Sequence, residues 1–184
     1  ADDVTGSNDI GIMFAKSDYL THIYSFKEDV ASFAVSKDNL SVPDILILDT
    51  NSRLDSPQVA YNKVFAATRA LQQADCRQFH INTCPVLRGN RGAEFDAMLD
   101  ALGLEFAVVV LGFPKNGRTT VDGIHYVHGK KLEESEFRRD PIHPMQRSDL
   151  VGILQSQTKR KVALLTHDVV DCGTETLRDE IQRM

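Results

Sequence analysis

Two short runs of consecutive apolar residues constrain most strongly what this chain can fold into. They are "DILIL" at 44–48 and "FAVVVL" at 106–111, and a polar loop follows each of them. Strands that are buried on both faces of a sheet read as such unbroken runs, because helices cover them from either side. The two runs therefore predict a mainly parallel sheet with helices on both faces.

Helical patterns follow the predicted strands along the chain. Over 58–73 the apolar residues recur at helical spacing, and Ser56-Pro57 supplies a cap and a first-turn proline. A second unit combines a strand at 77–82 with a helix at 92–102 that ends at Gly103. Such repeated units are typical of an α/β protein. The other expected elements are a helix at 8–15, strands at 20–26 and 162–165, a short helix from Ser148 and a terminal helix at 174–181.

The pattern changes after residue 111, where we predict a β-hairpin insertion. Asp122 and Gly123 form a strong signal for a tight turn, and β-branched and aromatic residues flank them. The chain contains no internal repeat and no flexible linker. We therefore expect residues 1–184 to form a single α/β domain.

Charge and cysteine usage indicate the class of partner. The net charge of the 184 residues is -5 and is spread along the chain, which argues against a nucleic acid or an anionic membrane. No apolar run approaches the roughly 20 residues that span a bilayer. Cys76, Cys84 and Cys172 form no CxxC pair, as expected of reduced thiols in a cytoplasmic protein. A small-molecule partner is favoured.

Polar side chains of both signs follow the predicted strands. The carboxyl ends of parallel strands meet at one edge of a sheet, and ligands bind there. The residue types at these ends suit a small anion with hydroxyl groups. They are Asp2, Asp3 and Asn8, then Asp49, Ser52 and Arg53, then Arg88 and Asn90, and finally Lys115 and Arg118.

The opening segment "DDVTGSND" places two carboxylates side by side. Asp2 and Asp3 point in different directions on an extended backbone, so one can face a ligand while the other caps a helix. A capped turn without a ligand is an open alternative. A phosphatase of the haloacid dehalogenase type would need its nucleophile at Ala1, and alanine cannot attack phosphorus.

The segment "LRGN" is an anion site in outline. Arg88 can bind a carboxylate or a phosphate through two hydrogen bonds, and Gly89 leaves room for it. The alternative is a structural ion pair between Arg88 and Asp49 or Glu94. The chain has no GxxxxGK[ST] or GxGxxG motif and no spacing of residues typical of a metal site. We therefore expect neither a nucleotide site nor a metal site of its own.

Five segments in order resemble the N-terminal domain of the four-carbon acid sugar kinase family. The resemblance implies an ATP-dependent kinase that acts on sugar acids such as threonate and erythronate. It further implies that this domain binds the sugar acid, whereas a C-terminal domain absent from this chain binds most of the ATP and Mg²⁺. The segments are "ADDVTGSND", "LDTNSR", "LRGNRGAEFDAMLDALG", "GRTTVDGIHYVHG" and "KKLEESEFRRDPIHP".

The same resemblance implies roles for individual residues. Asp2 and Asp3 would be the catalytic pair, contacting substrate hydroxyls, with one of them helping to deprotonate the phosphoryl acceptor. Arg88 would clamp the substrate carboxylate. The residues implied to bind substrate are Asn8, Asp9, Asp49, Ser52, Arg53, Arg88, Gly89, Asn90 and Arg118.

One segment departs from the family pattern. Where members typically carry a Lys, an Asp and a Ser-Thr pair before "LRGN", this chain has "NTCPV" at 82–86. The alternative function is therefore a diverged, inactive remnant that acts as a binding or regulatory protein. In the family that the chain resembles, a central strand precedes the "ADDVTGSND" motif. We therefore expect this chain to be a fragment of a two-domain kinase or a truncated member of the family.

Overall fold

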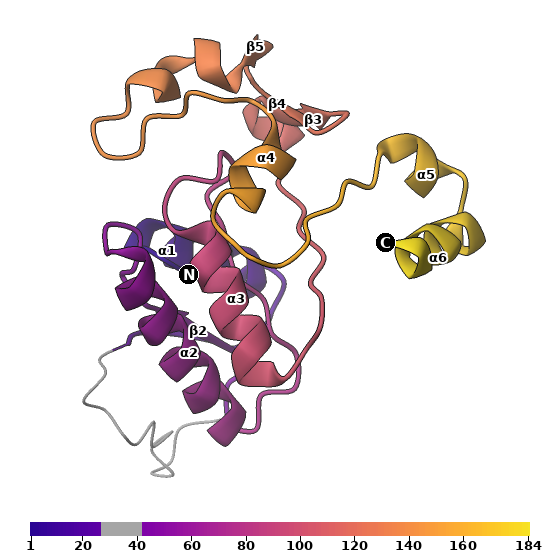
Figure 1. Ribbon diagram of the computed structural model, residues 1–184. Coiled ribbons are helices and arrows are strands. Elements are labelled where there is room, and N and C mark those ends of the chain that lie inside the picture. Colours follow the sequence, from indigo (N-terminus) through magenta and orange to yellow (C-terminus); the bar gives the residue numbers. More distant parts are fainter. Residues whose placement is uncertain (27–41) are drawn as a thin grey trace. The chain divides into compact units, whose positions relative to one another are not determined.

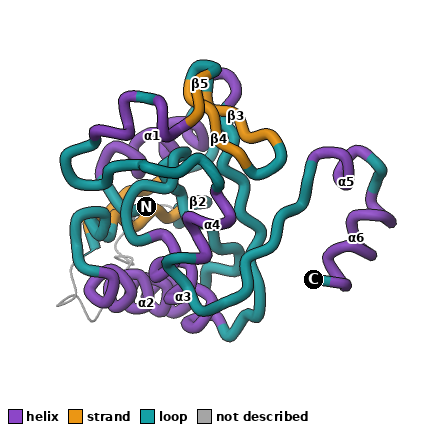
Figure 2. Tube along the Cα trace, turned by 45° about the horizontal axis from the view of Figure 1, so that its top comes forward, coloured by secondary structure: helices purple, strands orange, loops and turns teal. Residues whose placement is uncertain are grey.

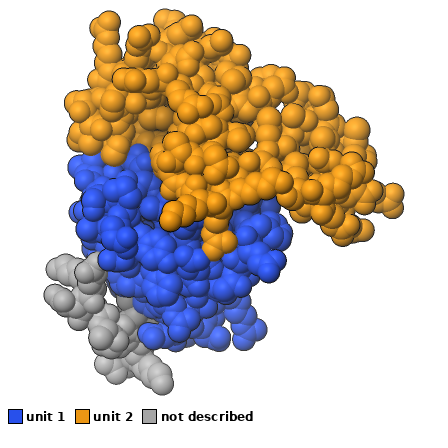
Figure 3. All heavy atoms as spheres, in the orientation of Figure 1, with its two compact units in different colours: residues 1–84, 89–109 blue, residues 85–88, 110–184 orange. Residues whose placement is uncertain are grey.

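The computed structural model describes residues 1–26 and 42–184. It divides into two compact units, which Figure 3 colours separately. Unit 1 comprises residues 1–84 and 89–109, and unit 2 comprises residues 85–88 and 110–184. Each unit contains its own helices and strands and is described by itself below.

Unit 1 contains three helices and a two-stranded sheet within its described residues (Figure 1). The helices predicted from apolar periodicity are confirmed, two of them to within one residue at their first turn. Gly103 ends the third helix in the left-handed conformation (φ 66°), as its position after the apolar pattern predicts. The elements are α1 (Val4–Ala15), β1 (Thr21–Ser25), β2 (Ile45–Asp49), α2 (Pro57–Gln73) and α3 (Arg91–Leu102).

The sheet of unit 1 pairs β1 and β2 in parallel. Thr21 lies opposite Ile45, and Ser25 lies opposite Asp49. Helix α1 packs against both strands. Gly11 permits this approach, because a Cβ at that position would lie 2.6 Å from Cδ1 of Ile23. The helix therefore depends on a glycine for its distance from the sheet.

The N-terminal residues lie along β2 as well. The amino group of Ala1 donates to the carbonyl of Leu48 (2.9 Å), and the amide of Thr50 donates to the carbonyl of Ala1 (2.9 Å). The neighbouring carbonyl, that of Asp49, accepts instead from Phe26, which follows β1. Successive carbonyls of a strand point to opposite edges, so Ala1 occupies the edge of β2 that β1 leaves open.

Helices α2 and α3 pack side by side, and Figure 1 shows them adjacent. Ala60, Val64 and Ala67 are buried on α2, at the helical spacing that predicted this helix. Ala97 and Ala101 are buried on α3. Small side chains at both surfaces allow two helix axes to lie close together.

Unit 2 carries the predicted β-hairpin. Asp122 (φ 48°) and Gly123 (φ 78°) both adopt positive φ, which is the backbone that a tight type I′ turn requires. Its elements are η1 (Pro114–Asn116), β3 (Arg118–Val121), β4 (Ile124–Val127), β5 (Lys130–Lys131), η2 (Leu132–Glu134), η3 (Glu136–Arg139), α4 (Leu150–Gln155), α5 (His167–Asp171) and α6 (Thr174–Arg183).

Strands β3, β4 and β5 form an antiparallel sheet. Val127 and Leu132 are buried beside it, and Ile153 of α4 is buried as well. Helix α4 is capped by the side chain of Asp149, which accepts from the amide of Gly152 at 2.6 Å. The short helix expected from Ser148 is therefore present and begins two residues later.

Three predicted strands are absent from the assigned sheets. Residues 77–82, 106–111 and 162–165 have irregular backbone, drawn as loop in Figure 2. A strand requires a backbone partner as well as apolar side chains, and none of the sheet pairings among the described residues involves these segments. Val108 and Val110 are accordingly exposed, by 70% and 81%. Mixed helices and strands are thus confirmed, with one parallel pair of strands.

No helix in the described part of the chain combines the length and the apolar character needed to cross a bilayer.

His125 predicts how the stability of unit 2 depends on pH. The side chain is fully buried, its Nδ1 lies 3.0 Å from Oγ1 of Thr120, and burial, with a smaller effect of Arg118, lowers its pKa to about 4. The unfolded state, with a pKa near 6.5, binds a proton first as pH falls. The free energy of unfolding should therefore decrease by roughly 2 kcal/mol between pH 7 and pH 5.

Urea unfolding at both pH values measures this loss. The variant H125N should unfold with a smaller pH dependence, whereas H167Q, at an exposed histidine, should behave as the parent chain does. An unchanged pH dependence in H125N would contradict the assignment.

Candidate functional site

Arg53 joins the two carboxylates of the opening motif. Its Nε donates to Oδ2 of Asp2 (2.7 Å), and its Nη2 donates to Oδ1 of the same residue (3.0 Å). Its Nη1 forms an ion pair with Asp3. The other oxygen of Asp3 caps α1 by accepting from the amide of Gly6 (2.7 Å). Asp3 thus caps a helix, as was predicted for one of the two acids, and Arg53 engages both.

A second layer of charge lies beneath Arg53. Arg91 is fully buried; it contacts the carboxylate of Asp2 and donates to Oε2 of Glu94 (2.6 Å). Oε1 of Glu94 accepts from Oγ of Ser52 (2.6 Å). Each buried charge therefore has an opposite charge or a hydroxyl beside it, as burial of ions requires.

This environment fixes the protonation state of Asp2. Burial raises the pKa of the carboxyl, but the hydrogen bond from Arg53 and the charge of Arg91 outweigh it, so the pKa lies below its usual value. Asp2 is therefore ionised at neutral pH. A carboxylate with a low pKa is a weak proton acceptor, which makes Asp2 better suited to holding other groups in place.

The neighbouring turns depend on backbone contacts of predicted site residues. Gly89 has φ 94°, and a Cβ there would lie 3.4 Å from Cγ of Arg53. Asn90 donates from Nδ2 to the carbonyl of Asp55 (2.7 Å). Asp49 accepts from the amide of Asn51 (2.9 Å). These residues shape the loops that carry Ser52 and Arg53.

Two predicted residues lie outside this network. Asn8 and Asp9 are exposed on α1, and neither side chain forms a hydrogen bond or ion pair with another residue that the structure describes. Asn82, from the segment that departs from the family pattern, does reach the opening motif. Its Nδ2 donates to the carbonyl of Gly6 at 2.8 Å.

Two predicted arginines of unit 2 meet on one aromatic ring. The guanidinium carbon of Arg88 lies 5.1 Å from the ring centroid of Phe137, and that of Arg118 lies 5.4 Å from it. Both distances are within the range of cation–π attraction. Arg88 also donates to Oδ2 of Asp140 at 3.0 Å, and Arg118 lies 2.9 Å from Nε2 of His128.

Four residues of these clusters were missing from the predicted site. Arg91 and Glu94 stand three residues apart on α3, a spacing that allows an ion pair, but such pairs are common on solvated helices. Phe137 and Asp140 belong to "EFRRDP". The dipeptide Asp140-Pro141 is a turn signal, and it could have identified the carboxylate that pairs with Arg88.

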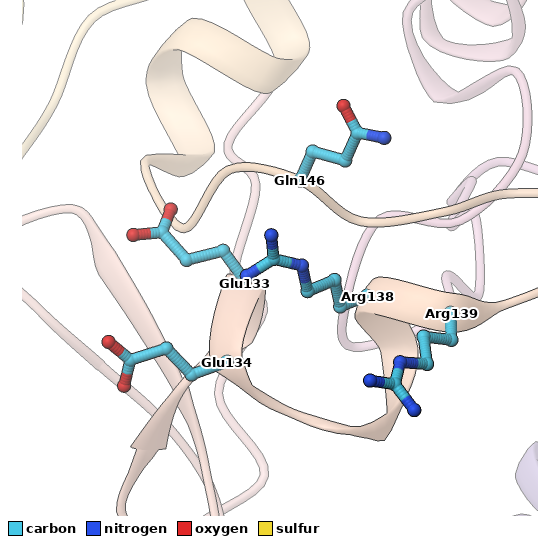
Figure 4. A pocket seen from close by; sticks show the side chains of 5 residues that line it. All are labelled: Glu133, Glu134, Arg138, Arg139 and Gln146. Atoms are coloured by element: carbon cyan, nitrogen blue, oxygen red, sulfur yellow. The ribbon is translucent and has the colours of Figure 1, made fainter.

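A polar concavity in unit 2 is lined by a different set of residues. Its volume is about 560 Å³, and Figure 4 shows the carboxylates and guanidiniums around it. None of the predicted site residues lines it. The lining residues are Glu133, Glu134, Arg138, Arg139 and Gln146.

Across 1–26 and 42–184, no three His, Cys, Asp or Glu side chains are grouped as a metal ion requires. The carboxylates of unit 1 are instead engaged by arginines and backbone amides.

Comparison with known proteins assigns the chain to a class. The model of the family described as "Sugar-binding N-terminal domain" matches residues 1–184. The protein belongs to this family. The match extends over both compact units.

Individual relatives agree with this assignment. The chain is 36% identical over 183 residues to a D-erythronate kinase of Heliobacterium modesticaldum, covering 98% of this chain and 40% of that one. It is 30% identical over 189 residues to a 3-oxo-tetronate kinase of Brucella melitensis, covering 100% of this chain and 42% of the relative. The chain thus spans less than half the length of these relatives.

A solved structure supports the fold. A Haemophilus influenzae protein superposes with a TM-score of 0.85 at 27% sequence identity, over 97% of this chain and 42% of that one. The fold described above therefore corresponds to less than half of a longer chain in this relative.

The buried ion network predicts an asymmetry between two acidic residues. D2N would leave the charges of Arg53 and Arg91 without their shared carboxylate and should lower the free energy of unfolding by about 3 to 5 kcal/mol. D9N, on the exposed face of α1, should change it by less than about 0.5 kcal/mol. Urea denaturation measures both. Equal effects of the two substitutions would contradict the structural role of Asp2.

Proposed function

We propose that this chain is the sugar-acid-binding domain of an ATP-dependent kinase that phosphorylates four-carbon acid sugars of the threonate and erythronate type. The family match and the names of the relatives support this proposal. The observation that carries it is the meeting of Arg88 and Arg118 on the ring of Phe137. Sequence had predicted both arginines as ligands of a substrate anion.

The two guanidiniums suit a carboxylate. Arginine presents parallel N–H groups that match the two oxygens of a carboxylate, and it keeps its charge at every physiological pH. Arg118 is mostly buried, with 14% of its side chain exposed, and Arg88 is partly buried, with 27% exposed. Partial burial strengthens the attraction for an anion because water screens it less. We assign substrate carboxylate binding to this pair.

The two acids of the opening motif take different roles in the proposal. Asp2 is buried and held ionised by arginines, so we assign it to orienting Arg53. Asp3 remains partly exposed, with 23% of its side chain accessible. We therefore propose Asp3 as the carboxylate that contacts a substrate hydroxyl and helps to remove its proton.

The proposal assigns ATP and Mg²⁺ to a C-terminal domain outside this chain. The curated relatives are longer than the match, which is consistent with such a domain. The phosphate-binding motifs absent from the sequence are not needed here for that reason. Mg²⁺ would neutralise charge on the transferred phosphoryl group when bound there.

The finer architecture is also a proposal. We propose that the sheet of unit 1 is part of a wider, mainly parallel sheet with helices on both faces. Ala1 already pairs with the second edge of β2. The apolar segment 106–111 has the composition of a strand that such a sheet would bury. The three cysteines form no disulfide, which supports a cytoplasmic location.

Ligand binding by the 184-residue chain tests the function. Erythronate or threonate at millimolar concentration should raise the melting temperature, whereas ATP alone should not. R88Q and R118Q should each raise the dissociation constant for the sugar acid by about tenfold or more, because each removes a charged hydrogen-bond donor. Isothermal titration calorimetry measures these values.

A matched control separates the arginine pair from general charge effects. R178Q changes the net charge equally at an exposed position of α6 and should leave the dissociation constant unchanged. The absence of binding to a panel of four-carbon sugar acids would overturn the proposal.

A second candidate function is a diverged remnant that no longer binds sugar acids. The observation that favours it is Asn82, which belongs to the segment 82–86 where the family that the chain resembles typically carries a lysine, and whose side chain donates to the carbonyl of Gly6. A neutral amide supplies no charge to an anionic substrate. The hydrogen bond therefore marks a change of chemistry next to the opening motif.

The substitution N82K distinguishes the two candidates. If the chain binds sugar acids, the added ammonium should lower the dissociation constant by a few-fold, because it attracts the substrate carboxylate. N82Q, which adds length without charge, is the control. Sugar-acid binding in N82K but not in the parent chain would favour the remnant. An unchanged dissociation constant in both N82K and N82Q would show that Asn82 does not affect sugar-acid binding.

A further inference from the structure

Asp140 is held more firmly than a surface aspartate usually is. Its Oδ1 accepts from the backbone amides of His143 (2.8 Å) and Ile142 (3.1 Å), and its Oδ2 accepts from Nη1 of Arg88 (3.0 Å). Pro141 follows it and fixes one backbone angle of the turn. One oxygen thus fixes the carboxylate to the main chain, and the other engages the arginine.

These contacts keep Asp140 negatively charged. The amide of His143 contributes most to lowering the pKa of the carboxyl, to about 2, and the hydrogen bond from Arg88 adds to this. The carboxylate is therefore ionised at neutral pH and presents a negative charge to Arg88. The side chain of Asp140 is 15% exposed, so little water competes for it.

Phe137 supports the same guanidinium from another direction. It lies on η3, three residues before Asp140, and its ring attracts both Arg88 and Arg118. Ser135 accepts from the amide of Phe137 (3.2 Å), and it is itself buried. The ring is thus attached to a capped turn of backbone. Two like charges share one aromatic surface that attracts each of them.

We propose that Asp140 and Phe137 are positioning residues that hold the guanidinium of Arg88 in a preformed orientation for a carboxylate ligand. This inference rests on the proposed function, because it concerns the same arginine. Positioning reduces the conformational entropy that Arg88 would lose on binding, and long side chains lose much. Asp140 offsets one positive charge where Arg88 and Arg118 both approach Phe137. We do not assign either residue a contact with substrate.

The orientation of Arg88 is measured first without any ligand. In the chain labelled with ¹⁵N-arginine, the variant R88K identifies the Nη signals of Arg88 by their loss. A held guanidinium rotates slowly about its Cζ–Nη bonds and gives resolved signals. D140N retains the size of the side chain but removes the charge, and it should broaden or merge these signals. F137L should do so to a smaller extent.

The control is D149N. Asp149 also accepts from a backbone amide, that of Gly152, and pairs with an arginine, Arg147, but it has no contact with Arg88. This variant should leave the Arg88 signals unchanged. Arg88 signals in D140N that match the parent chain would overturn the inference, whether or not any sugar acid binds.

Binding measures the consequence of positioning. D140N should raise the dissociation constant for erythronate by about tenfold, although it removes a negative charge. D149N removes a negative charge as well and should leave the dissociation constant unchanged. A purely electrostatic role of Asp140 predicts the opposite, which is tighter binding of the anion in D140N. Unchanged or tighter binding would therefore overturn the inference.

The two proposals fail in different ways. If the parent chain binds no sugar acid, the proposed function fails, and the ligand-free Arg88 signals still decide whether Asp140 positions the guanidinium. If D140N does not fold, F137L provides the same two measurements. Parent-like signals in F137L would then overturn the inference.

Discussion

Unit 1 depends on the ion pairs that the carboxylate of Asp2 forms with two arginines. The carboxylate lies between Arg53 from the loop after β2 and Arg91 from the first turn of α3. Arg91 in turn holds Glu94, and Glu94 holds Ser52. Three segments far apart in the sequence are thus joined by one buried set of charges. Such a set is costly to bury and still more costly to break, so it fixes the loops in one arrangement.

The arginines of unit 2 follow a different rule. Arg88 and Arg118 are not neutralised inside a core but gather on the face of an aromatic ring at partly buried positions. Asp140 compensates Arg88, and Glu136 lies near Arg118 at 3.9 Å. The buried charges around Asp2 therefore neutralise one another, whereas Arg88 and Arg118 bring two positive charges together. Under the proposed function, this second arrangement binds the anion.

Sequence predicted those features whose cause is local. The turn at Asp122-Gly123, the helix end at Gly103 and the apolar stripe of α2 each depend on residues close together in the chain, and the structure contains all three. The run "FAVVVL" shows the limit of this reasoning. Its composition indicates burial, but strand formation depends on a distant backbone partner, which composition does not specify.

The same distinction explains the candidate site. Asp2, Asp3, Arg53 and Arg88 were predicted as candidates because carboxylates and arginines in loops are chemically distinctive. Arg91 was not, since an arginine directly before a predicted helix shows no sign of burial in the sequence. Phe137 and Asp140 act by positioning Arg88, and the residue type alone does not indicate such a role. Their positions become meaningful only once the distances to Arg88 are known.

The turn that begins at Asp140 has a consequence for how this region can diverge. Oδ1 of Asp140 binds the main-chain amides of residues 142 and 143, and every amino acid except proline supplies such an amide. The side chains at these two positions are therefore free to vary among relatives. Asp140 and Arg88, in contrast, are expected to be kept or replaced together, because each depends on the charge and geometry of the other. A comparison of many relatives should show variation immediately beside a fixed pair, with the fixed pair separated by more than fifty residues of chain.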